Sequence, residues 1–124
     1  METESEKEIF KSILSYAESA LKTVILINGG ACLALLAFLG NIIAKGINTK
    51  VVIEFSFPIL LYVAGVLVGA IATGAAYLTQ YSYIHFSRKT AVMWHFISAI
   101  FVIVAYVAFA AGSYMCYIAF TKIA

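Results

Sequence analysis

The feature that most constrains this chain is the run of residues 57–85, which contains no Asp, Glu, Lys or Arg. It exceeds the roughly 20 residues that a helix needs to cross about 30 Å of hydrocarbon. Residues 23–44 and 91–120 are uncharged in the same way. The chain is therefore predicted to be an all-α membrane protein with transmembrane helices at about 23–44, 57–85 and 91–120, which together form one domain of residues 23–124.

The composition agrees with this class, since 64% of the 124 residues are hydrophobic and 11% are charged. Soluble domains carry about 25% charged residues. A net charge of +2 without any Lys/Arg run gives no indication of nucleic-acid binding. The two Cys and two His residues lack the spacing of metal ligands, so we expect neither a metal nor another cofactor.

Residues 1–22 are the most polar part of the chain. Ile9, Ile13, Ala17 and Leu21 recur near the helical period between charged residues. This pattern predicts an N-terminal amphipathic helix that leads into the membrane and lies on its interface or on the bundle. The segment is acidic and too long for a signal-peptide n-region, so we expect it to stay on the mature protein.

The connections are predicted from turn residues. Residues 45–55 are expected to form a polar loop, with Gly46 as the helix stop and Pro58 in the first turn of the next helix. Residues 87–90 are expected to form a short turn. The third run could reach about 45 Å as a helix, so it must tilt, protrude or break.

Small residues mark candidate packing faces, because they let membrane helices approach closely. In the second span such residues repeat every four positions, and the first and third spans each contribute one more. We expect these positions to serve helix packing, either within the chain or between copies: Gly30, Gly65, Gly69, Thr73 and Gly112.

Polar side chains provide the one candidate site. With the helix ends aligned at the cytoplasmic side, Asn28, Gln80 and His95 lie at similar depth on three different helices. An unpaired amide in hydrocarbon costs several kcal/mol, so these groups are predicted to face inward. They either form a polar layer that sets helix register or line a site for a small ligand, a lipid headgroup or water. The full set is Asn28, Tyr77, Gln80, Tyr81, Trp94 and His95.

Catalysis is not predicted. The chain has no Asp, no acidic residue after Glu54, and no phosphate loop, H-E-x-x-H or C-x-x-C motif.

With three spans, five basic residues share the side of the N-terminus and three lie opposite, which favours a cytoplasmic N-terminus. The first group is Lys7, Lys11, Lys22, Arg88 and Lys89, and the second is Lys45, Lys50 and Lys122.

Two stretches, LINGGACLALLAFLG at residues 26–40 and GAIATGAAYLTQY at residues 69–81, carry a resemblance. The chain resembles a widespread set of small bacterial inner-membrane proteins of uncharacterised function. These share an Asn-Gly-Gly-Ala start to the first span and a Gly-x-Ala-Tyr-Leu-x-Gln motif. The resemblance implies a multi-pass protein of the bacterial inner membrane, with Asn28, Tyr77 and Gln80 as the polar residues of the motifs.

These observations lead to two functional hypotheses. The first is a non-enzymatic integral membrane protein that acts through helix association in the lipid bilayer, as a homo-oligomer or as a subunit of a larger membrane assembly. The alternative is an oligomeric pore-forming protein, holin-like or acting in host defence. A transporter is disfavoured because the chain has no intramembrane charge and no second half.

Overall fold

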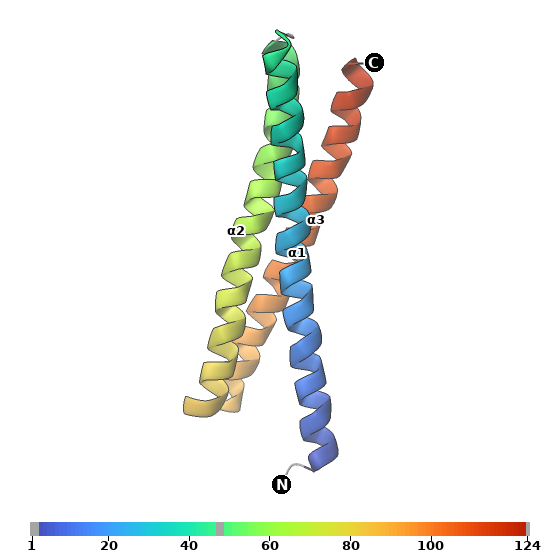
Figure 1. The fold of residues 1–124 in the computed structure, drawn as a ribbon. Helices are drawn as coiled ribbons and strands as arrows, with labels where there is room; N and C mark the ends of the chain where they lie inside the picture. Colours follow the sequence, from blue (N-terminus) through green and yellow to red (C-terminus); the bar gives the residue numbers. More distant parts are fainter. Residues whose placement is uncertain (1–2, 47–48, 124) are drawn as a thin grey trace.

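The computed structural model describes residues 3–46 and 49–123, and this part of the chain contains three α-helices and no strand. They are α1 (Glu4–Ala44), α2 (Thr49–His85) and α3 (Arg88–Ile123). The helices run up, down and up in an elongated bundle (Figure 1). Each is long and apolar enough to cross a membrane. The prediction of an all-helical chain with three long apolar helices is confirmed.

The first helix is longer than predicted. The Thr3 hydroxyl accepts a hydrogen bond from the Glu6 N–H at 3.3 Å, and the Glu6 carboxylate accepts one from the Thr3 N–H at 3.1 Å. From this capping box α1 continues for 41 residues. The predicted boundary at residue 22 is no break, because no Gly or Pro lies near it and Glu18 pairs with Lys22 at 3.1 Å across it. The arm and the first span are therefore one helix.

The second helix begins at Thr49, so the predicted loop of residues 45–55 is wrong. Gly46 does end α1, with φ of +73°, as expected of a helix stop. The extra turns of α2 are stabilised by Phe55, which is fully buried. Pro58 thus lies inside the helix rather than in its first turn. In the turn before it, the Ser56 hydroxyl donates to the Ile53 carbonyl at 2.7 Å.

The turn between α2 and α3 is also shorter than predicted. Only Phe86 and Ser87 separate the helices, and the Ser87 hydroxyl accepts a hydrogen bond from the Thr90 N–H at 3.3 Å. Because α3 has 36 residues without interruption, it is about 54 Å long. The long third run is therefore not broken.

The packing is dominated by the α2–α3 pair, whereas α1 packs mainly on α2. The Ser98 hydroxyl donates to the Ala72 carbonyl across the α2–α3 contact at 3.0 Å. The buried positions of α3 follow one another at seven-residue intervals, a spacing typical of left-handed helix pairs. All are small: Ala91, Ser98, Ala105, Gly112 and Ala119.

Glycines allow the closest of these contacts. A Cβ atom at Gly65 would overlap the Asn28 side-chain amide of α1. A Cβ atom at Gly69 would come within 2.8 Å of Ile25 Cγ1, and one at Gly112 within 2.9 Å of Tyr62 Cε1. These positions thus hold the α1–α2 and α2–α3 contacts at a distance that a side chain would increase.

The other two residues predicted to serve helix packing, Gly30 and Thr73, are placed differently. Gly30 is exposed, and a Cβ atom there would meet nothing within 4 Å. Thr73 is exposed as well, and its hydroxyl donates to the Gly69 carbonyl of its own helix at 3.0 Å. Neither residue packs between helices of one chain.

The end of the bundle at the α1–α2 loop is closed by aromatic rings, one from each helix. The ring centroids of Phe55 and Phe120 are 4.9 Å apart, and Phe38 lies 5.4–5.5 Å from both. Outside this cluster, Lys122 of α3 pairs with Glu54 of α2 at 3.5 Å. We call this end the loop end and the opposite one the turn end.

Candidate functional site

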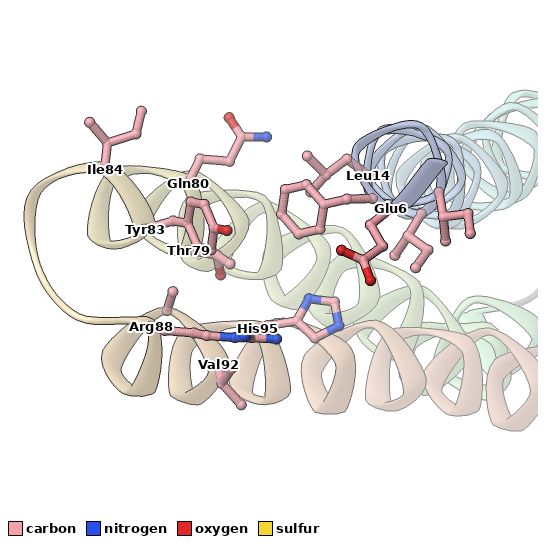
Figure 2. Close-up of a pocket in the computed structure, with 13 residues that line it drawn as sticks. Glu6, Leu14, Thr79, Gln80, Tyr83, Ile84, Arg88, Val92 and His95 are labelled. Carbon is pink, nitrogen blue, oxygen red and sulfur yellow. The ribbon is translucent and has the colours of Figure 1, made fainter. Parts of the chain in front are cut away.

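At the turn end, the N-terminal part of α1 diverges from the α2–α3 pair (Figure 1). The space between them is a groove of about 750 Å³, which we call the outer groove. Figure 2 shows its walls, with Glu6 and Leu14 on α1, Gln80 and Tyr83 on α2, and Arg88, Val92 and His95 on α3. The remaining lining residues are Ile9, Phe10, Ile13, Thr79, Ile84 and Ala91.

The groove continues toward the middle of the bundle as a second space of about 480 Å³, the inner groove. The two parts share Leu14, Thr79, Gln80 and His95. The rest of the inner lining is largely apolar and small: Ala17, Glu18, Ala20, Leu21, Thr73, Ala76, Tyr77, Ser98, Ala99, Val102 and Ile103. Arg88 lines the outer groove only, whereas Ala, Leu, Val and Ile make up most of the residues that line the inner groove only.

The α1 wall of the outer groove is largely apolar and includes Ile9 and Ile13 of the pattern predicted for residues 1–22. Ile9, Phe10 and Ile13 face the outer groove and remain exposed. The Phe10 ring stacks on Tyr83 of α2 at a centroid distance of 5.5 Å, a contact across the groove. One aromatic contact leaves the rest of this wall uncovered, which keeps the groove open.

The charges in the groove are unequally matched. Glu6 accepts the capping hydrogen bond from the Thr3 N–H, and Glu18 pairs with Lys22. Arg88 forms no ion pair with any residue in 3–46 or 49–123. It begins α3, where the helix dipole adds partial positive charge. Arg88 is therefore the basic group available to a ligand.

The predicted polar layer is not formed. Asn28 is fully buried in the middle of the bundle, and its Nδ2 donates to the Val24 carbonyl at 2.8 Å and to the Ala105 carbonyl of α3 at 3.3 Å. The structure separates it from Gln80 and His95, which line the groove beside Leu14. Asn28 is about 21 Å along α1 from Leu14. The error came from aligning helix ends at residue 23, although α1 begins at Glu4.

Asn28 nevertheless holds the three helices in register. It lies against Gly65 of α2 while it donates to α3. Its Oδ1 has no hydrogen-bond partner within the described residues. That oxygen faces the Cα of Gly65, where only a weak C–H···O contact is available.

The other predicted polar residues divide between the groove and the bundle surface. Tyr77 lines the inner groove. Tyr81 is exposed, and its ring centroid lies 4.5 Å from that of His85. Trp94 is partly buried and lines neither part of the groove. The structure thus gathers Tyr77, Gln80 and His95 of the predicted set.

The sequence reasoning missed Arg88, Glu6 and Phe10 as neighbours of these residues. The sequence feature that could have predicted this contact is the apolar stripe of residues 9–14, which needs a partner surface if the helix continues into the first span.

No group of three His, Cys, Asp or Glu side chains able to hold a metal ion occurs in the described ranges. Comparison with protein-family models, curated proteins and solved structures found no match for this chain.

Proposed function

We propose that this chain is a non-enzymatic integral membrane protein of the bacterial inner membrane that acts through helix association. It works as a homo-oligomer or as a subunit of a larger membrane assembly. The three long apolar helices support a membrane location, and the bacterial inner membrane is what the resemblance proposed for residues 26–40 and 69–81 implies.

The observation that carries it is the outer face of α1. Two glycines of α2 are used within the chain, since Gly65 and Gly69 pack against α1. On the opposite side of α1, exposed positions alternate in steps of four and three along the helix, as in a helix–helix seam. They are Leu26, Gly30, Leu33, Ala37, Gly40 and Ala44. A face of small and leucine residues in a membrane favours association with another helix.

Oligomer size in a mild detergent tests this proposal. Ala37→Leu should shift the protein to a smaller species, because the larger side chain separates the facing helices. Ala110→Leu makes the same change at an exposed position of α3 and should leave the size unchanged. A monomeric wild-type protein that copurifies with no partner, or equal effects of the two variants, would contradict the assignment.

Orientation follows from the basic residues. The proposed topology places the N-terminal end of α1 and the α2–α3 turn on the cytoplasmic side, with the polar side of the N-terminal segment at the membrane interface. In a background lacking Cys32 and Cys116, Thr49→Cys should react with an impermeant thiol reagent outside intact cells, and Ser87→Cys should not. The reverse labelling pattern would invert the topology.

The same cells separate this proposal from pore formation. Induced expression should leave growth and dye exclusion unchanged, because the proposed function opens no passage across the membrane. Growth arrest with dye entry would instead favour the pore-forming alternative.

A further inference from the structure

We propose that the groove at the turn end binds one anionic phospholipid of the surrounding bilayer, with its phosphate at Arg88 and an acyl chain in the inner groove. This site is separate from the association face of α1. It goes beyond the proposed function and shares with it only the membrane location.

The polarity of the groove matches an amphiphile in orientation. Arg88 of α3 lines the outer groove only, and Gln80 of α2 and His95 of α3 lie where the two parts meet (Figure 2). The inner groove is lined mainly by small and aliphatic side chains, such as Ala76, Ala99 and Val102. A headgroup outside and a chain inside satisfy both parts, since a buried chain contacts apolar walls while the phosphate keeps polar partners.

Charge selects the headgroup. Glu18 pairs with Lys22, whereas Glu6 keeps its negative charge at the N-terminus of α1, where it accepts the Thr3 N–H and the helix dipole stabilises it. Arg88 has no ion-pair partner in 3–46 or 49–123 and stands at the positive end of α3. A guanidinium binds phosphate oxygens in two parallel hydrogen bonds, and basic pockets between membrane helices bind lipid phosphates.

The level of the groove along the bundle fits the same ligand. After the uncharged residues 57–85 of α2, Arg88 is the first permanently charged side chain that the chain reaches. The α2–α3 pair therefore leaves the hydrocarbon near the outer groove. A lipid in the adjacent leaflet has its phosphate at this level and its chains toward the middle of the bundle, where the inner groove extends.

Lipid binding to the full chain tests the proposal. Protein stripped of lipid in a mild detergent is titrated with phosphatidylglycerol or with phosphatidylcholine of the same chains, and bound lipid is counted by native mass spectrometry. We expect one tightly bound phosphatidylglycerol per chain and at least tenfold weaker binding of phosphatidylcholine. Arg88→Gln should weaken phosphatidylglycerol binding at least tenfold, whereas Lys89→Gln, at an exposed neighbour that does not line the groove, should change it less than twofold.

A second variant tests whether the inner groove binds the acyl chain of the lipid. Ala99→Phe fills the inner groove and should abolish tight binding, while circular dichroism and oligomer size report whether the fold and the association face are intact.

Equal binding of the two lipids, equal effects of Arg88→Gln and Lys89→Gln, or full binding by Ala99→Phe would overturn the proposal. Competition by glycerol phosphate at equal concentration would also overturn it, since the site would then recognise the phosphate alone. Cross-linking of Ile13→Cys to Val92→Cys between copies would assign the groove to a protein partner.

Discussion

The two ends of this bundle are built from the same apolar helices and yet are packed in opposite ways. At the loop end, Phe38, Phe55 and Phe120 bring one aromatic ring from each helix into a single cluster. At the turn end, the one aromatic contact between α1 and its neighbours is Phe10 on Tyr83, among the ring pairs of the described residues. The loop end is closed, and the turn end contains the groove.

The difference shows that hydrophobicity alone does not pack helices in a membrane. Exposed apolar residues lie along all three helices, and lipid solvates them as well as a neighbouring helix does. Contacts form where shapes fit, as the Phe55 ring does at one end and glycines do in the middle. Where α1 carries charged residues between its apolar ones, the helices separate and a ligand-sized space remains.

The largest expected effect comes from opening the closed end. Phe55→Ala removes a fully buried ring between two others and should lower the free energy of unfolding by about 3 kcal/mol. Phe10→Ala, at the open end, removes one exposed stacked ring and should cost about 1 kcal/mol. Thermal unfolding in the same detergent compares them, and equal losses would show that the two ends are equally packed.

The middle of the bundle gives the next effect. Gly65→Ala places a methyl group against the Asn28 amide and should cost about 1–3 kcal/mol. Gly74→Ala meets nothing within 4 Å and should stabilise the exposed helix surface by up to about 1 kcal/mol. The two melting temperatures should move in opposite directions, and a loss at both positions would place Gly74 in a contact between chains.

A double-mutant cycle sharpens the assignment of Asn28. Asn28→Ala alone should be mild, because interhelical hydrogen bonds in membranes average about 0.6 kcal/mol. It removes the atoms that a methyl group at Gly65 would meet, so Asn28→Ala combined with Gly65→Ala should cost less than the sum. The pair Asn28→Ala and Gln80→Ala should add within about 0.5 kcal/mol. Non-additive losses of unfolding free energy for Asn28 with Gln80, and additive losses for Asn28 with Gly65, would instead support the predicted polar layer.

The smallest effect is expected from the surface ion pairs. Glu54→Gln breaks the pair with Lys122 at the loop end and should cost less than about 1 kcal/mol, because both side chains are 41–60% exposed. Glu18→Gln breaks the exposed pair with Lys22 at the turn end and should cost about 0.3–0.5 kcal/mol. High salt should reduce both losses, and a salt-independent loss at Glu54 would indicate a role in packing the loop end.

The sequence by itself determined the three apolar helices and their rough positions. An uncharged run of more than about 20 residues fits a membrane-spanning helix and is about twice as long as a barrel strand, whatever the tertiary contacts are. Gly46 ended α1 as predicted, because its positive φ is a local property of glycine. Tyr77, Gln80 and His95 were also predicted as members of one site, since the short α2–α3 turn makes these two helix ends neighbours.

Only the tertiary structure decided where α1 lies along the other two helices. A helix slides against its neighbours without changing its own periodicity, so register depends on which side chains fit together. The fit of Asn28 against Gly65 and of Ile25 against Gly69 moved Asn28 to the middle of the bundle and residues 6–14 to the level of the α2–α3 turn. That register places residues 6–14 of α1 opposite Arg88 and so forms the groove. No single run of residues along the chain contains the information that sets the register.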